Sequence, residues 1–249
     1  MTLPLFDVQC GFGGAKPGQK VLLTAQDCLV EMDRLTIDRA LVRTVPEDLD
    51  RDAVQSNDRL FAACRGEPRL APCPVIFPSA ADDLPPEPEQ VSAFIDAGAG
   101  AVWIRPAHDT WSLKAWASGA LMDALTERRL PVVCLQRMVD LESVADLAGR
   151  YADLPLVVAD TSYRYQRMLV PLLESFPNVH LSLGSNYTLH CGIERLVRAV
   201  GPEQLLFGTG FPEIEPMMAV TQLVYAEISD ADKAMIGSGN LERLLGGIQ

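Results

Sequence analysis

Histidine is scarce in this sequence of 249 residues, which has only three: His108, His180 and His190. A metal centre built mainly from imidazoles therefore has few ligands to draw on. The cysteine spacing also excludes zinc-ribbon and thioredoxin-like sites. None of the six cysteines belongs to a C-x-x-C pair, the pattern of zinc ribbons and thioredoxin-like redox sites. We expect the six scattered thiols to be reduced and buried.

Long apolar runs and excess positive charge are also missing. No stretch approaches the roughly 18 apolar residues that cross a bilayer, and the first residues lack the basic start and apolar run of an export signal. The net charge is −12 and the pI is near 4.7, so nucleic acids and anionic membranes would repel the chain. We predict a cytoplasmic protein with neither nucleic-acid nor membrane partners.

Three further motifs are absent. The chain has no G-x-G-x-x-G and no G-x-x-x-x-G-K-[ST], so nothing predicts a nucleotide-binding loop. It also lacks the G-x-S-x-G turn that presents a nucleophilic serine in many hydrolases. The sequence therefore predicts no cofactor.

Short apolar runs of strand length alternate with longer amphipathic runs along the whole chain. The expected strands are 5–12, 39–45, 70–77, 101–105, 131–135, 155–160, 178–183 and 204–207. The expected helices are 25–37, 50–69, 90–97, 113–129, 141–152, 165–175, 192–200, 216–228 and 232–245. This alternation predicts an α/β fold with a parallel sheet. Eight units favour a TIM-type (β/α)8 barrel as a single domain over residues 1–249, with an open doubly wound sheet as the alternative.

Four strings, in this order, resemble those of a known family. They are Glu31–Ala40 (EMDRLTIDRA), Ser56–Leu60 (SNDRL), Leu206–Pro212 (LFGTGFP) and Gly239–Leu244 (GNLERL). The family is the amidohydrolase superfamily, in the branch of aminocarboxymuconate-semialdehyde decarboxylase and related lactonases. The resemblance extends over about the whole chain and implies the same barrel.

The resemblance also implies a divalent metal at the barrel mouth, held by an H-x-H pair on strand one, histidines on strands five and six, and an aspartate on strand eight. Here Gln9 and Gly11 stand at the H-x-H positions, and Gly210 stands at the aspartate position. Strand five offers Leu135 or Gln136, and strand six offers Asp160 or Thr161. We therefore expect no metal site. Asp7, which precedes the H-x-H positions, is expected to bond neighbouring backbone.

In such barrels the functional side chains follow the carboxyl ends of the strands. Asp160 and His190 are the expected catalytic acid or base. The expected substrate-binding residues are Gln9, Arg43, Arg105, His108, Gln136, Arg137 and Tyr163. Arginines at strand ends suit a carboxylate or phosphate, because the guanidinium fork binds either in a bidentate manner. The alternative is that each arginine pairs with one of the 33 acidic residues.

Three functions remain open at this point. The first is a hydrolase, lactonase-like or amidohydrolase-like, that acts on a small anionic substrate without the usual metal. The second is a pseudoenzyme that binds a ligand or a partner. The third is a metal hydrolase whose ligands are residues other than those at the positions named above. It is the weakest of the three, because the chain has only three histidines. A homo-oligomer with Trp111 or Trp116 at its interface is a further expectation.

Overall fold

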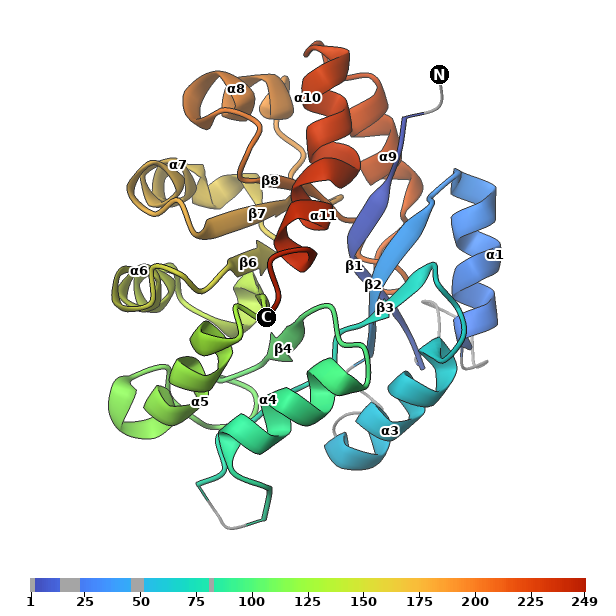
Figure 1. The fold of residues 1–249 in the computed structure, drawn as a ribbon. Helices are drawn as coiled ribbons and strands as arrows, with labels where there is room; N and C mark the ends of the chain where they lie inside the picture. Colours follow the sequence, from blue (N-terminus) through green and yellow to red (C-terminus); the bar gives the residue numbers. More distant parts are fainter. Residues whose placement is uncertain (1–2, 14–22, 46–51, 81–82) are drawn as a thin grey trace.

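The computed structural model describes residues 3–13, 23–45, 52–80 and 83–249. These residues contain eight strands that alternate with helices, as the hydrophobic pattern predicts. The strands are β1 (Phe6–Phe12), β2 (Arg39–Thr44), β3 (Leu70–Pro72), β4 (Val102–Ile104), β5 (Val132–Leu135), β6 (Leu156–Ala159), β7 (Val179–Leu183) and β8 (Leu205–Phe207). Figure 1 shows the helices arranged as a ring around these strands.

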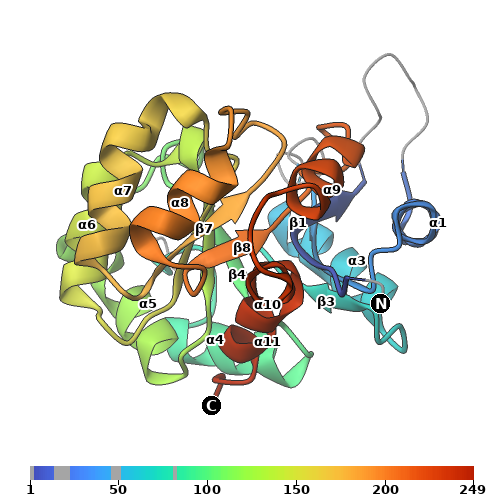
Figure 2. The ribbon, with the colours of Figure 1, turned by 90° about the horizontal axis from the view of Figure 1, so that it is seen from above.

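The helices of the ring follow the strands in order. They are α1 (Ala25–Leu35), α3 (Ala53–Cys64), α4 (Glu87–Asp96), α5 (Ala115–Glu127), α6 (Leu141–Arg150), α7 (Gln166–Ser175), α8 (Gly192–Val200) and α9 (Met217–Val224). Polar side chains cap the N-termini of several helices. Thr24, Asp52 and Asp140 accept hydrogen bonds from backbone N–H groups of α1, α3 and α6, respectively. Viewed after a 90° turn, α6 and α7 lie on the opposite side of the strands from α1 (Figure 2).

All strand pairs are parallel, in a group β1-β2-β3 and a group β4-β5-β6-β7-β8. Two seams close these groups into a (β/α)8 barrel. At one seam Trp103 N donates to Pro74 O at 2.8 Å and Ile76 N donates to Trp103 O at 3.1 Å. At the other, Gly210 N donates to Gln9 O at 2.8 Å. The strand expected over 70–77 is therefore only partly paired, because prolines 72 and 74 have no N–H to donate.

The buried side chains form two apolar clusters on the two faces of the closed sheet. The outer cluster lies between strands and helices. The inner one fills the barrel and includes Phe6, Leu41, Trp103, Val133 and Leu206. Such a packed interior leaves function to the strand ends and loops.

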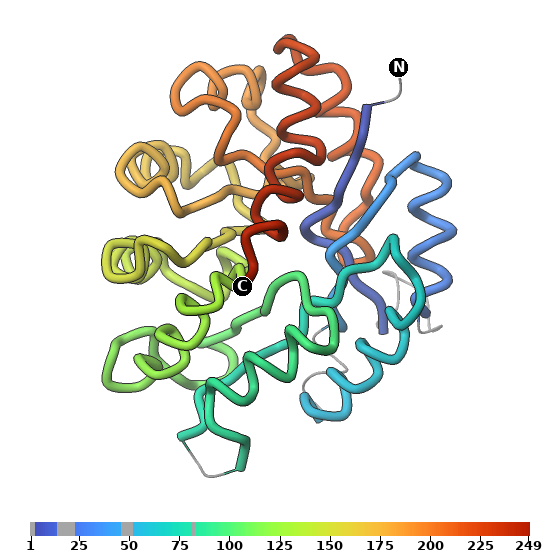
Figure 3. The backbone as a smooth tube through the Cα atoms, in the orientation of Figure 1, coloured from blue at the N-terminus to red at the C-terminus, as the bar shows by residue number. Residues whose placement is uncertain are grey.

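The chain ends in a helical segment that covers one end of the barrel. It consists of α10 (Asp230–Ala234), a π-helical turn (Met235–Gly239) and α11 (Asn240–Leu245). Leu241 and Leu244 of α11 belong to the inner cluster. In Figure 3 the dark red end of the tube lies at the centre of the ring. None of the described helices is long and apolar enough to cross a membrane.

Candidate functional site

Four charged side chains from four strand ends meet at the barrel mouth, and we call them the mouth cluster. Arg43 belongs to β2, and Arg137 lies in the short helix η1 (Gln136–Met138) after β5. Asp160 follows β6 and Glu213 follows β8. Glu213 bridges the two arginines, with Oε2 2.5 Å from Arg43 Nη2 and Oε1 3.1 Å from Arg137 Nη2. Arg137 also pairs through Nη1 with Asp160.

Arg43 is the most deeply buried member of the mouth cluster. Its side chain is only 4% exposed, and its guanidinium carbon lies 4.3 Å from the centre of the Trp103 ring. Within the described part of the chain, its Nε and Nη1 have no hydrogen-bond partner. A buried donor without an acceptor costs about 1–3 kcal/mol. Arg43 therefore has two buried N–H groups that the described residues leave without an acceptor.

Asp160 is held from three sides. Its backbone has a left-handed φ of 58°, and its side chain is 8% exposed. The carboxylate accepts from Arg137 and from Asn186 Nδ2, while its own N–H donates to Gln9 Oε1 at 3.2 Å. Asp160, Gln9 and Arg137, which the sequence predicts as site residues, are thus in direct contact.

Glu213 is ionised in this environment. Burial raises the pKa of its carboxyl, but the charges and hydrogen bonds of Arg43 and Arg137 outweigh burial and hold the pKa below its ordinary value. Two acids and two arginines make the mouth cluster neutral overall. Its Glu213 carboxylate already occupies the position between Arg43 and Arg137 that an anionic ligand would use.

Asp7 fastens β1 to β8 beneath this cluster. Its Oδ1 accepts from Gln9 N at 2.8 Å and from Thr209 N at 2.9 Å, and its Oδ2 accepts from the Thr209 hydroxyl. Burial raises the pKa of the Asp7 carboxyl, although these hydrogen bonds oppose the effect. Asp7 is the backbone-bonded residue that the strand-one motif predicts.

The other predicted site residues lie outside the mouth cluster. Arg105 is buried and makes a bidentate pair with Asp109, with N–O distances of 3.0 and 2.7 Å. His108 and Tyr163 are exposed. His190 is also exposed, and its Nε2 lies 3.5 Å from the Cys191 sulfur. Thus Arg43, Arg105 and Arg137 each have a carboxylate partner, which matches the ion-pair alternative.

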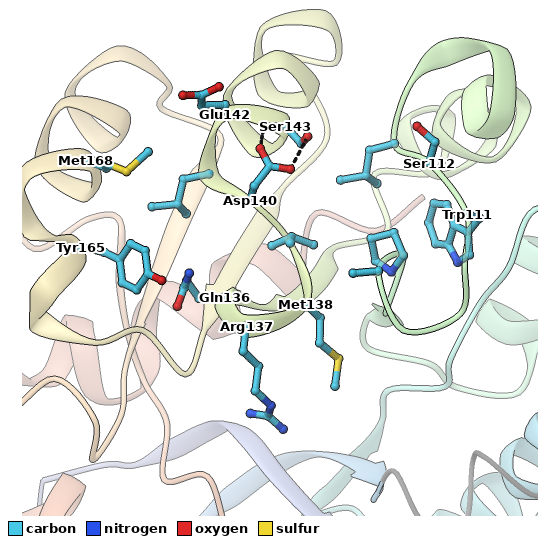
Figure 4. Close-up of a pocket in the computed structure, with 15 residues that line it drawn as sticks. Trp111, Ser112, Gln136, Arg137, Met138, Asp140, Glu142, Ser143, Tyr165 and Met168 are labelled. Atoms are coloured by element: carbon cyan, nitrogen blue, oxygen red, sulfur yellow. Dashed lines mark hydrogen bonds between the residues drawn. The ribbon is translucent and has the colours of Figure 1, made fainter.

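A pocket of about 830 Å³ lies beside the mouth cluster. It is lined by η1, by the loop after β4 and by the first turns of α6, and includes Gln136, Arg137, Trp111, Met138 and Met168. Figure 4 shows the Arg137 side chain pointing away from Asp140 and Ser143 of this pocket. Arg137 therefore belongs to both the pocket lining and the mouth cluster.

Trp103, Asn186 and Glu213 are functional candidates that the predicted set omits. Glu213 and Asn186 follow strand ends, where functional residues of such barrels lie, so their place in the sequence could have identified them. Trp103 reads as a core residue in the sequence, and only the structure shows Arg43 stacked on it. Three aromatic residues near strand ends, Phe12, Phe211 and Tyr163, could fill the mouth. Phe12 and Phe211 belong instead to the outer cluster, and Tyr163 is exposed.

The residues at the positions where the family resemblance implies a metal do not fit a divalent ion. Glycine has no side chain to offer at positions 11 and 210, and a Cβ on Gly11 would lie 2.9 Å from Arg43 O. Asp160 already accepts hydrogen bonds from Arg137 and Asn186. Among the described residues, no group of three or more histidine, cysteine or acidic side chains could share a metal ion.

Gly210 has a backbone conformation and close surroundings that favour glycine. Its φ is +79°, and a Cβ there would lie 2.9 Å from Ile214 Cδ1. We expect Gly210→Asp, which introduces the carboxylate that the family resemblance implies at this position, to lower the free energy of unfolding by about 1–3 kcal/mol, measured by urea denaturation. The matched control is Gly119→Ala in α5, where the new Cβ would make an ordinary 3.9 Å contact. That control should raise stability by about 0.5–1 kcal/mol. Equal stability of Gly210→Asp and the natural protein would contradict the account of this loop.

Comparisons with known proteins agree with this architecture. The chain is similar in fold to an uncharacterised TIM-barrel protein from Bordetella bronchiseptica, with a TM-score of 0.77, 15% identity, and coverage of 98% of this chain and 99% of that one. It is also similar to 5-carboxyvanillate decarboxylase from Sphingomonas paucimobilis, with a TM-score of 0.74, 14% identity and full coverage of both chains. A dihydroxybenzoic acid decarboxylase from a Polaromonas species, solved with bound manganese, has a TM-score of 0.72, 14% identity, and 98% and 97% coverage.

Identities this low establish the fold alone. Among curated proteins, no sequence matches this chain. A family model described as amidohydrolase, in contrast, matches residues 14–247, nearly the whole length. The chain therefore belongs to the amidohydrolase family.

Proposed function

We propose that this protein binds a small carboxylate at the barrel mouth and hydrolyses an ester or amide bond of that molecule, as a lactonase-like enzyme does, without a divalent metal. The observation that carries the proposal is Arg43, a buried cation with two N–H groups that lack a hydrogen-bond partner among the described residues. The ligand carboxylate takes the place of the Glu213 carboxylate between Arg43 and Arg137. Arg137 then presents the ligand to the adjacent pocket of about 830 Å³.

Asp160 is the residue best placed to move a proton. In the proposed reaction, Asp160 accepts a proton from a water molecule as the water oxygen attacks the carbonyl carbon. Arg137 stabilises the charge that develops on the carbonyl oxygen. The C–O or C–N bond then breaks, and the leaving group takes the proton back from Asp160. His190 has no part in this scheme, because its contact is with Cys191.

A specific observation favours the second candidate, a ligand-binding barrel without catalysis. The two oxygens of the Asp160 carboxylate already accept from Arg137 and Asn186, so neither oxygen is free to take a proton from a water molecule. The proteins of similar fold that are named decarboxylases support a third chemistry, loss of carbon dioxide from the bound carboxylate. All three share the same carboxylate site.

Binding is tested with two variants of opposite expected effect. Arg43→Gln should weaken the binding of small carboxylates by about 30-fold or more, because a buried charge partner is worth 2 kcal/mol or more. Glu213→Gln removes the competing internal carboxylate and should tighten binding by about tenfold. The measurement is isothermal titration with benzoate and succinate, and benzamide and succinamide are the uncharged controls. Unfolding would weaken carboxylate binding in both variants. Tighter binding by Glu213→Gln therefore cannot be an effect of unfolding and would support the proposed site.

A turnover assay distinguishes the three candidate functions: hydrolysis, decarboxylation and binding without catalysis. Incubation with a panel of lactones, carboxylated amides and hydroxybenzoates, followed by mass spectrometry, shows a gain of water for hydrolysis and a loss of carbon dioxide for decarboxylation. We expect a gain of water that Asp160→Asn abolishes. Binding without any mass change would support the non-catalytic barrel, and carboxylates that bind no better than amides would overturn the whole proposal.

A further inference from the structure

Two carboxylates at the barrel mouth face a single guanidinium. Arg137 donates from Nη1 to Asp160 and from Nη2 to Glu213, the latter at 3.1 Å. Asp160 comes from the end of β6 and Glu213 from the loop after β8. A planar guanidinium can bind two separate carboxylates at once, which an ammonium point charge does less well. One cation of the chain itself therefore connects two strand ends across the mouth.

This cation lies among the strand ends where the family resemblance places a metal. The resemblance assigns metal ligands to strands five, six and eight as well as strand one, and Arg137, Asp160 and Glu213 follow strands five, six and eight. The natural donor set does not fit a divalent ion, for the reasons given above for Gly11 and Gly210. A metal ion would also have to displace a tethered guanidinium that keeps its charge at any physiological pH.

We propose that the Arg137 guanidinium is the resident counter-ion of the barrel mouth and replaces the divalent metal there. Arg137 holds Asp160 and Glu213 in position and, together with Arg43, balances their charge, so the free protein needs no ion from solution. Removal of the guanidinium leaves two carboxylates around one gap. Oxygen ligands of this kind suit manganese, so the gap should then accept a manganese ion. The inference concerns the free protein and stands apart from the function proposed above.

The test compares cation dependence in the natural protein and in Arg137→Ala. Thermal unfolding is followed without added metal and with about 5 mM MnCl2, a concentration sufficient for a weak site of two carboxylates. We expect no shift in the natural protein. In Arg137→Ala we expect manganese to raise the unfolding temperature by about 2–4 °C. Plasma mass spectrometry of the natural protein, after manganese loading and desalting, should find far less than one ion per chain.

Two control variants exclude general effects. Arg164→Ala removes an exposed arginine of the next loop and should leave the protein as insensitive to manganese as before. Arg137→Lys keeps a cation in place and should also show no manganese shift. A tightly held ion in the natural protein would overturn the inference, as would an Arg137→Ala variant that folds but gains no stability from manganese. If Arg137→Ala fails to fold alone, the inference requires manganese to restore folding. None of these readouts depends on a carboxylate ligand, so they can fail independently of the proposed function.

Discussion

Trp103→Ala should lower the free energy of unfolding by about 3–5 kcal/mol, a large part of the 5–15 kcal/mol typical of a folded protein. Trp103 is completely buried in the inner cluster. It lies opposite Val133 on β5 and forms the bridge to Val75 that joins the two groups of strands. Its loss would leave a cavity at the seam of the barrel, which neighbouring strands cannot close without moving.

The loss of the Trp103 ring should also disturb the mouth cluster. Arg43 lies 4.3 Å above its ring and Arg105 lies 5.6 Å from it, so the ring fixes two buried cations through cation–π contacts. The control is Trp103→Phe, which keeps an aromatic face and removes an indole N–H that has no hydrogen-bond partner in the described part of the chain. We expect this variant to lose much less stability. Urea unfolding measures both variants, and a loss below about 1 kcal/mol for Trp103→Ala would contradict the argument.

The barrel could be predicted from the sequence because its strands are buried on both faces. Such strands appear as continuous apolar runs, and the helices between them show one apolar stripe each. The strand β5 begins one residue later than predicted and ends at the predicted Leu135, while α8 has the expected bounds Gly192–Val200. Deviations occur where backbone chemistry interferes, as at the proline-interrupted β3. The helix expected over 50–69 is observed as Ala53–Cys64, and residues 50–51 lie outside the described part of the chain.

The pairing of the arginines illustrates what a sequence cannot show. Arg105 and Asp109 are four residues apart, a separation at which side chains commonly meet in a helical turn. Glu213 lies 170 positions from Arg43, so only the closed barrel brings them together. The sequence therefore leaves open whether the strand-end arginines bind an anion or pair with acidic residues, whereas the structure shows a neutral cluster with acids in place. This difference makes Glu213 the competitor that any anionic ligand must displace.

Mild acid should destabilise this protein through His180. The side chain lies in β7, and burial, with the charge of Arg243, lowers its pKa from 6.5 to about 4. In the unfolded chain the imidazole binds a proton below its ordinary pKa of 6.5, while in the folded protein it stays neutral until about pH 4. Stability is therefore fully present above pH 6.5 and falls progressively below it. Between roughly pH 7.5 and pH 5 the loss should be about 2 kcal/mol.

The pH window separates His180 from the Glu213 carboxyl. Glu213 has a pKa below its ordinary value of 4.5, so its ion pairs with Arg43 and Arg137 persist at pH 5 and begin to fail only in stronger acid. The control is His180→Gln, which keeps a polar side chain and removes the titrating group. Urea unfolding at several pH values should give a clear slope for the natural protein and a nearly flat line for His180→Gln. If both proteins lose the same stability by pH 5, the slope does not come from His180.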